Sequence, residues 1–289
     1  MTTVHIIQKD ILKIILESPK RFTPIALEKM ISQKFALEKR QAKTVISDLV
    51  TKGEITYIYQ YGCTFLERSF NKPVHISKRV VLKPPEIDYT PRSEEVVINI
   101  RHGASFGTGQ HPTTRLAIRG IEHALKDNAY IKDKKGNALL DIGTGSGVLA
   151  IAAVQMGIEK GIGIDIDPCS IAEARENIRI NDLENRINIS DQAVEEIHRS
   201  FSLIIANLRY PTLIRLFSHL TEITDPDGVI ILSGIKADEL EELLRVYTKK
   251  NFECRWQAVE KDWAGVVMKN ASVSYLESEP VDKMIYLRL

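Results

Sequence analysis

Residues 139–150 read Leu139-Leu140-Asp141-Ile142-Gly143-Thr144-Gly145-Ser146-Gly147-Val148-Leu149-Ala150, and this stretch decides the fold. An apolar run typical of a buried strand leads into three alternating glycines, and an apolar helix follows them. Glycine lets the backbone approach a ligand closely and adopt positive φ without a side-chain clash. The stretch therefore predicts a strand–loop–helix unit that binds a ligand at the carboxyl edge of a parallel sheet.

The chain around this unit alternates between helices and strands from about residue 113 onward. Apolar periodicity predicts helices over 113–126, 148–156, 170–181, 211–223 and 238–250, and strands over 138–142, 161–166, 187–190, 203–206, 229–233, 254–259 and 265–269. Such alternation builds a doubly wound, mostly parallel, seven-stranded α/β sheet with helices on both faces. No helix separates the last two strands, so we expect them to form an antiparallel hairpin on that sheet.

Residues 1–68 carry a different pattern. Helices are predicted over 8–17, from Pro24 with Thr23 as its cap, and over 38–51, and the β-rich run 54–66 predicts a hairpin. Three short helices followed by a hairpin resemble a winged helix-turn-helix. We therefore expect a winged-helix-like α+β domain over 1–68, a linker with short strands over 69–100, an α/β domain over 101–270 and an extension over 271–289.

Composition excludes several classes of protein. The chain is 44% hydrophobic and 27% charged with a net charge of +1, so it is neither disordered nor, as a whole, a binder of nucleic acid or membranes. Residues 1–70 carry eleven Lys and Arg against seven Asp and Glu, which indicates a separate, mildly basic module. The three cysteines are far apart, so no disulfide framework and no metal site is expected. Without a secretion signal or an apolar span, a cytoplasmic protein is predicted.

The residues around the glycines indicate the chemistry of the ligand. Asp165 ends the next predicted strand and is placed to accept both hydroxyls of a ribose. The spacing of Gly145, Gly147, Ala150 and Asp165 also satisfies a dinucleotide fingerprint. Asp141 separates the two interpretations, because a carboxylate before the first glycine would repel a diphosphate and attract a sulfonium and an ammonium group. The residues therefore favour S-adenosylmethionine over NAD, and a tight turn without a ligand is the third interpretation.

Two polar residues follow later strands at the same predicted edge. Asp191 could accept from an adenine amino group or serve as a structural cap. Asn207 comes after the fourth strand, where a side-chain amide is well placed for a substrate. The alternative for Asn207 is a turn residue whose side chain bonds to its own backbone.

One further segment carries a resemblance to a known family. The run Phe106-Gly107-Thr108-Gly109-Gln110-His111-Pro112-Thr113-Thr114 resembles the signature of the PrmA family of ribosomal protein methyltransferases. The segments 141–147, 163–168, 206–208, 233–235 and 262–263 support it in register, and the resemblance covers roughly residues 73–270. It implies a class I S-adenosylmethionine-dependent methyltransferase fold and S-adenosylmethionine as the cofactor.

The resemblance and the local chemistry together give the expected site. Asn207 and Thr114 are the expected catalytic residues. The expected cofactor-binding residues are Phe106, Gly107, Thr108, Gly109, Thr114, Asp141, Gly143, Gly145, Gly147, Asp165, Ile166, Asp191 and Asn207. Phe106 and its glycines would form a lid over the cofactor, while the first-turn amides of the helix after Pro112 would bind a carboxylate. His111 is interpreted as a capping or packing residue, with a direct role as the alternative.

Three functions remain open at this point. The first is N-methylation of lysine or amino groups of a protein, ribosomal or other, with a protein partner. The second is methylation of amino groups in DNA or RNA, guided by the winged helix, because Asn207-Leu208-Arg209-Tyr210 keeps two positions of an N-P-P-Y loop. The third is a regulator that only senses the ligand. Residues 1–68, which do not resemble the family's substrate domain, could bind nucleic acid or protein.

Overall fold

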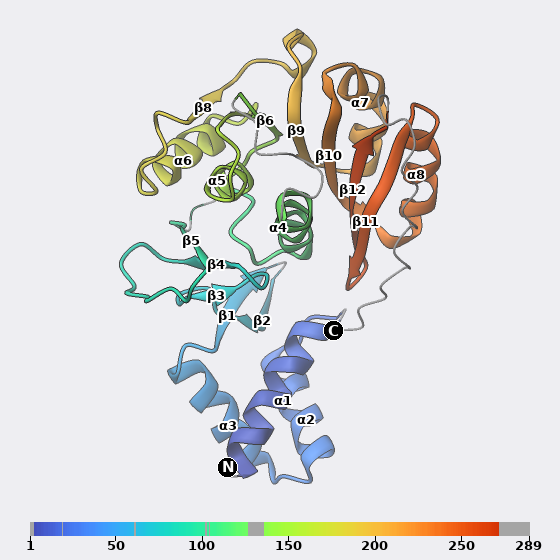
Figure 1. The fold of residues 1–289 in the computed structure, drawn as a ribbon. Coiled ribbons are helices and arrows are strands. Elements are labelled where there is room, and N and C mark those ends of the chain that lie inside the picture. Colours follow the sequence, from blue (N-terminus) through green and yellow to red (C-terminus); the bar gives the residue numbers. More distant parts are fainter. Residues whose placement is uncertain are drawn as a thin grey trace. The chain divides into compact units, whose positions relative to one another are not determined.

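The computed structural model describes residues 3–18, 20–60, 62–101, 103, 105–126 and 136–271, and the chain separates into two compact units at Lys72 (Figure 1). Apart from Ala271, the predicted extension over 271–289 lies outside the described residues. No helix among the described residues is long and apolar enough to span a membrane.

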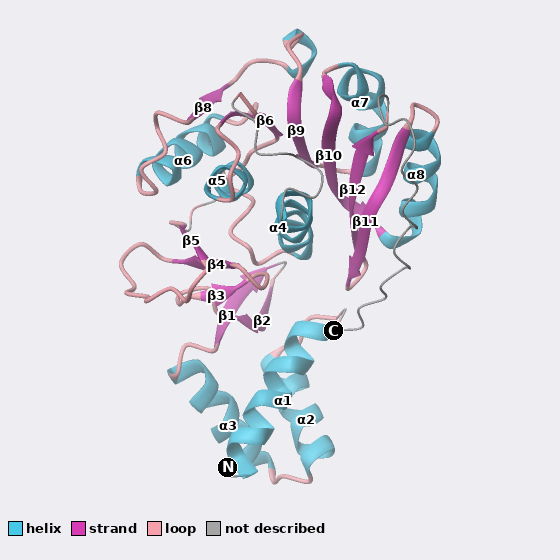
Figure 2. Ribbon diagram, viewed as in Figure 1, coloured by secondary structure: helices cyan, strands magenta, loops and turns pink. Residues whose placement is uncertain are grey.

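The first unit contains three helices followed by an antiparallel hairpin, which is the predicted order (Figure 2). The elements are α1 (Thr3–Glu17), α2 (Pro24–Phe35), α3 (Lys39–Thr51), β1 (Ile55–Gln60) and β2 (Cys63–Arg68). Thr23 caps α2 as expected, because its hydroxyl accepts from the amide of Ala26 at 3.2 Å. The first helix begins five residues earlier than predicted, and Ile7 in that added turn packs against the core one turn before Ile11.

The second unit begins with a small three-stranded sheet. Its strands are β3 (Val74–His75), β4 (Val80–Lys83) and β5 (Val96–Asn99), in that spatial order. β4 and β5 are parallel and lie in the segment 69–100, for which short strands were predicted, whereas the two residues of β3 are too few to show a periodicity.

A seven-stranded sheet forms the centre of the second unit, with the order β11-β12-β10-β9-β6-β7-β8 (Figure 1). Its strands are β6 (Ala138–Ile142), β7 (Lys160–Ile164), β8 (Ile187–Ser190), β9 (Phe201–Asn207), β10 (Thr224–Lys236), β11 (Phe252–Glu260) and β12 (Trp263–Asn270). β12 alone runs antiparallel to its neighbours, and with β11 it forms the predicted hairpin. The doubly wound, mostly parallel α/β fold is thereby confirmed.

Helices connect and cover these strands. They are α4 (Pro112–Leu125), α5 (Val148–Gln155), α6 (Pro168–Arg179), α7 (Tyr210–Glu222) and α8 (Leu240–Thr248), with short 3-10 turns η2 (Val194–Glu196) and η3 (Ala237–Glu239). η3 and α8 together replace the single helix predicted over 238–250.

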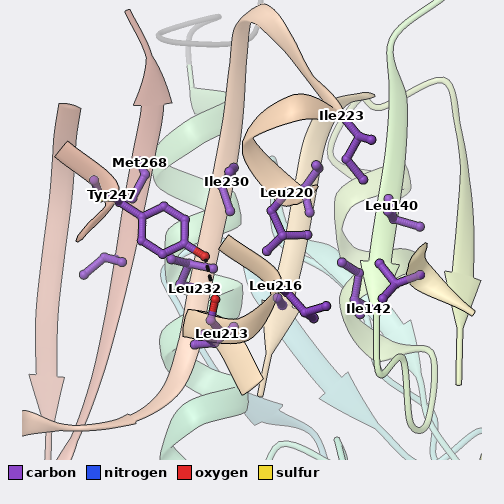
Figure 3. Close-up of a cluster of buried hydrophobic side chains, with 14 of the residues drawn as sticks. Leu140, Ile142, Leu213, Leu216, Leu220, Ile223, Ile230, Leu232, Tyr247 and Met268 are labelled. Carbon is purple, nitrogen blue, oxygen red and sulfur yellow. Dashed lines mark hydrogen bonds between the residues drawn. The ribbon is translucent and has the colours of Figure 1, made fainter. Parts of the chain in front are cut away.

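The two faces of the sheet pack differently. On one face, leucines of α7 and α8 meet the inward side chains of β6, β9 and β10, and the hydroxyl of Tyr247 donates to the carbonyl of Leu213 at 3.3 Å (Figure 3). On the other face, α4 approaches closely because of two glycines. A Cβ on Gly120 would lie 3.0 Å from Ile231, and one on Gly265 would lie 2.9 Å from Leu116. This tight packing fixes α4, which carries part of the site, against the sheet.

Candidate active site

The glycine loop, residues 143–147, lies where the strand order of the sheet reverses. β7 and β8 extend from β6 in one direction, and β9 and β10 extend in the other. The amides of Gly143 and Thr144 both donate to the carbonyl of Ile164 at the end of β7, at 2.9 Å each. Ligands of open α/β sheets bind outside the carboxyl ends of the strands at such a reversal, and the predicted loop stands there.

A second loop, residues 105–110, contacts the glycine loop. The carbonyl of Phe106 accepts from the amide of Ser146 at 2.8 Å. A Cβ on Gly145 would lie 2.4 Å from that same carbonyl oxygen, and one on Gly107 would lie 2.6 Å from the hydroxyl of Ser146. Only glycine permits this approach. The phenyl ring of Phe106 remains 51% exposed, while Thr108 is half-buried and Gly109 is buried.

Arg115 of α4 forms hydrogen bonds with the main chain of the second loop. Its Nη1 donates to the carbonyls of Gly109 (2.8 Å) and Gln110 (2.5 Å), and its Nε donates to Glu260 at the end of β11 (2.7 Å). The other oxygen of Glu260 accepts from Arg119, one turn further along α4. Our sequence reasoning missed Arg115 and Glu260, which are 145 residues apart. The only local signal is that Arg115 directly follows the resemblance segment.

The first turn of α4 faces the same region. The ring of His111 caps the helix, since its Nδ1 accepts from the amide of Thr113 at 3.3 Å and lies 2.8 Å from the Thr113 hydroxyl. The capping interpretation of His111 is thereby confirmed. Thr114 is fully buried, and its hydroxyl has no hydrogen-bond partner among the described residues. An unpartnered buried hydroxyl is available to a ligand.

Asp141 is a fully buried carboxyl group at the end of β6. Its Oδ2 accepts from the hydroxyl of Thr144 at 2.7 Å, whereas Oδ1 has no hydrogen-bond partner in the described part of the chain. Burial raises the pKa of Asp141 to about 7. The hydrogen bonds from the hydroxyl of Thr144 and from the main chain of Ala150 offset part of that rise, and the nearby charge of Asp165 adds to it. A cationic ligand would satisfy this group and lower its pKa.

Asp165 follows β7 and is tied to the glycine loop. Its Oδ2 accepts from the amide of Gly145 (2.9 Å), and its Oδ1 accepts from the amide of Asp167 (3.0 Å). Each carboxylate oxygen can accept a second bond, so the group is held in place with acceptor capacity left for hydroxyls. Ile166 beside it is 90% exposed, and Asp191 after β8 is exposed as well.

Asn207 ends β9 and pairs in register with Ser233 of β10. Its side chain is half-buried and makes no hydrogen bond to any described residue. The hydroxyl of Ser233, which sequence reasoning missed, is fully buried and likewise lacks a partner among the described residues. Leu208 connects β10 to the glycine loop. Its amide donates to the carbonyl of Ser233 (3.0 Å), and its side chain lies so close to Gly143 that a Cβ there would be 2.7 Å from it.

The indole ring of Trp263 lies near this end of β9 and β10, with the cations of Lys236 and Arg209 beside it. Trp263 pairs in register with Lys236, whose Nζ lies 4.0 Å from the centre of the indole ring. Arg209, two residues after Asn207, places its guanidinium carbon 5.8 Å from the same ring, and His111 meets it edge-on at 4.8 Å. The indole thus joins the capped start of α4 to the ends of β9 and β10.

The described residues contain no group of three or more His, Cys, Asp or Glu side chains that could hold a metal ion. Cys63, Cys169 and Cys254 are free thiols.

The site residues fit S-adenosylmethionine on their own chemistry. The Oδ1 of Asp141 and the hydroxyl of Thr114 are buried polar atoms without a partner among the described residues, and a bound ligand would satisfy them. Asp141 and Asp165 place two carboxylates beside the glycine loop, where a diphosphate would be repelled and a sulfonium with an ammonium group would be stabilised.

Comparison with known proteins agrees with this geometry. The family model described as ribosomal protein L11 methyltransferase (PrmA) matches residues 66–271. The ribosomal protein L11 methyltransferase of Heliobacterium modesticaldum is 32% identical over 208 residues, which cover 72% of this chain and 63% of the relative. That of Pelobacter propionicus is 33% identical over 202 residues, covering 70% and 64%. The chain thus spans less than two thirds of the length of these relatives.

A solved structure extends the similarity to three dimensions. The crystal structure of ribosomal protein L11 methylase from Lactobacillus delbrueckii subsp. bulgaricus superposes with a TM-score of 0.61 at 28% sequence identity. The match covers 69% of this chain and 98% of that one.

Proposed function

Because this chain belongs to the ribosomal protein L11 methyltransferase (PrmA) family, whose model matches residues 66–271, we propose that it methylates amino groups of a protein with S-adenosylmethionine as donor. The observation that carries this proposal is the family match over the unit that also holds the unpartnered Asp141, Thr114 and Ser233. The class I α/β fold, shared with the methylase structure, supplies the frame.

Within this proposal the cofactor supplies an activated methyl group, and the chain supplies position. The glycine loop and the backbone of Phe106–Gly109 would enclose the donor, and Asp165 would hold its ribose. Asp191 would accept from the adenine amino group. Thr114, with its hydroxyl and its main-chain amide in the first turn of α4, would hold the amino-acid end. Ile166, exposed beside Asp165, would cover the nucleoside.

Asn207 would act on the acceptor. A lysine amine has a pKa near ~10.4, so exposing its lone pair at pH 7 costs roughly 5 kcal/mol. The amide oxygen of Asn207 is free to accept an N–H of the amine and orient the lone pair. Arg209 and Lys236 carry positive charge nearby, which disfavours a protonated amine and lowers its pKa.

The methyl acceptor belongs to the proposal as well. The relatives are named for ribosomal protein L11, so we propose a ribosomal protein as the substrate and the cytoplasm as the location of the reaction. Residues 1–65 fall outside the family match. Because this unit differs from the family, it could recruit an acceptor other than L11, so the proposed acceptor is L11 itself or another ribosomal protein.

The nucleic-acid methyltransferase alternative is not favoured. Tyr210, which would have to stack a base, is the first residue of α7 and packs against the core of the sheet.

The test uses the full chain, methyl-labelled cofactor, purified ribosomal protein L11, total ribosomal protein and ribosomal RNA. We expect label in a protein fraction, removed by protease and resistant to nuclease. Label in RNA would support the nucleic-acid alternative instead. Cofactor binding without transfer to any of these acceptors would contradict the proposal and favour the ligand-sensing alternative.

A further inference from the structure

The first unit has a helix pair that the proposed reaction does not use. α2 and α3 are joined by a three-residue turn, Ala36–Glu38, in which Ala36 adopts positive φ (51°). The described residues of this unit bury their own core, formed by Ile11, Ile15, Leu27, Ile31, Ala42, Val45, Ile46, Leu49, Ile55 and Leu66. A three-residue turn between two helices is the connection found in helix-turn-helix motifs, in which α3 would be the second helix.

The outward face of α3 is cationic and hydroxylated. Its inward face consists of Ala42, Val45, Ile46 and Leu49. On the opposite side, Arg40, Lys43, Thr44 and Ser47 follow the i, i+3, i+4, i+7 spacing of a single helix face, and all four are exposed. This row of four contains two cations and two hydroxyls, and the exposed carboxylate of Asp48 lies at its edge, one turn after Thr44.

The two cations in this row are unengaged. Neither the guanidinium of Arg40 nor the amine of Lys43 forms an ion pair or hydrogen bond within the described residues, whereas Lys39 beside them lies 3.7 Å from Glu28. Residues 1–70 as a whole carry a net charge of +4. The row is therefore a free positive surface on a positively charged unit.

The hairpin after α3 exposes two aromatic side chains. Ile55, Tyr57 and Tyr59 alternate along β1 and share one face of the hairpin. Ile55 is buried in the core at the base, while Tyr57 is 52% exposed and Tyr59 is 73% exposed. Their hydroxyls make no hydrogen bond among the described residues, so the outer half of the hairpin presents two unpartnered phenols.

We infer that the first unit binds duplex DNA, with the Arg40–Lys43–Thr44–Ser47 row of α3 in the major groove. Tyr57 and Tyr59 of the hairpin add contacts to the sugar–phosphate backbone. The major groove of B-form DNA admits an α-helix, and cations with hydroxyls are the groups that contact phosphates and base edges there. The major groove of A-form RNA is too narrow and deep for such a helix, so charge and shape together favour DNA over RNA. This inference does not depend on the methyltransferase proposal.

The test measures fluorescence anisotropy of labelled mixed-sequence duplex DNA of about 25 base pairs with the full chain, from ~50 to ~200 mM salt. Duplex RNA of the same length is the competitor. The double variant Arg40→Ala/Lys43→Ala removes two charges from the row. The matched control, Lys249→Ala/Lys250→Ala, removes two exposed charges after α8 in the other unit.

We expect the α3 variant to weaken DNA binding by more than ~10-fold and to reduce the salt slope by about 2, while the control variant binds as the parent does. Circular dichroism melts confirm that both variants fold. Absence of DNA binding by the parent chain at ~50 mM salt, tighter binding of duplex RNA, or equal weakening by both variants would each overturn the inference. Calorimetric binding of S-adenosylmethionine to the same α3 variant should be unchanged, because the proposed cofactor site lies in the other unit, and this keeps the outcome separate from the proposed function.

Discussion

The main-chain amide of Gly145 donates to the carboxylate of Asp165 over 2.9 Å, so the ends of β6 and β7 are joined directly at the rim of the site. The same glycine lies against the carbonyl of Phe106 from the loop before α4. Three segments of chain therefore meet at one residue without a side chain, and the geometry of the proposed pocket depends on all three.

Replacing Asp165 tests cofactor recognition. We expect Asp165→Ala to weaken S-adenosylmethionine binding by more than ~100-fold, because an acceptor for hydroxyls and for the Gly145 amide is lost together. Asp167→Ala is the control. It removes the cap of α6, where Asp167 accepts from Ser170 at 3.2 Å, and should cost about 1 kcal/mol of stability without changing affinity. Calorimetry decides, and unchanged binding in Asp165→Ala would remove this residue from the site.

Replacing Asn207 separates binding from transfer. Asn207→Ala should bind the cofactor within ~2-fold of the parent, yet methyl transfer should fall by about 100-fold, since the acceptor amine loses its orienting group. Initial rates with labelled cofactor, compared with calorimetry on the same preparation, provide the measurement. A variant with full turnover would show that Asn207 has no part in the mechanism.

Arg115 is expected to position the loop before α4. Arg115→Ala removes the donors to the carbonyls of Gly109 and Gln110 and should raise the KM for cofactor by roughly 10-fold. Arg119→Ala removes a contact to Glu260 but none to the loop, so its KM should change by less than ~2-fold. Equal effects of the two substitutions would mean that the shared carboxylate, and not the loop, is what matters.

Asp141 predicts a pH dependence of stability in the absence of cofactor. Its pKa is about 7 in the folded chain against 3.8 for the unfolded group, so between these values the folded state holds a proton that the unfolded state has released. The stabilisation that protonated Asp141 contributes is complete below pH 3.8 and is lost as the pH rises to the folded-state pKa of about 7. The loss between about pH 5 and pH 7 should be roughly 3 kcal/mol.

Urea unfolding at several pH values measures this effect. The Asp141→Asn variant should lack the part of the slope that Asp141 causes, and saturating S-adenosylmethionine should reduce it in the parent chain. Identical pH profiles for parent and variant would contradict the assigned shift of the Asp141 pKa.

The parts of the fold that the sequence predicted are those with local causes. The glycine loop, the strands on either side and the Thr23 cap each follow from neighbouring residues. The predicted ends of the helices differ from the observed ends by five residues or fewer. The doubly wound order follows from strand–helix alternation and the handedness of crossovers. β3 has only two residues, too few for any period to show.

What the sequence could not predict are contacts between distant segments. The bond from Arg115 to Glu260 joins residues 145 positions apart, and nothing near either residue indicates the other. Ser233 read as an ordinary strand residue, because its pairing with Asn207 depends on the register of β9 and β10. The contact between the amine of Lys236 and the indole ring of Trp263 likewise joins two strands, and neither residue indicates it in the sequence.

The reversed strand β12 has a consequence for synthesis of the chain. It brings Trp263, with Glu260 just before it, to the same rim as a glycine loop translated more than a hundred residues earlier. A nascent polypeptide that has emerged only as far as β10 already contains every glycine of the loop, yet it lacks the anion that anchors both arginines of α4. The ion pairs that hold Arg115 and Arg119 of α4 can therefore form only after the last hairpin has left the ribosome.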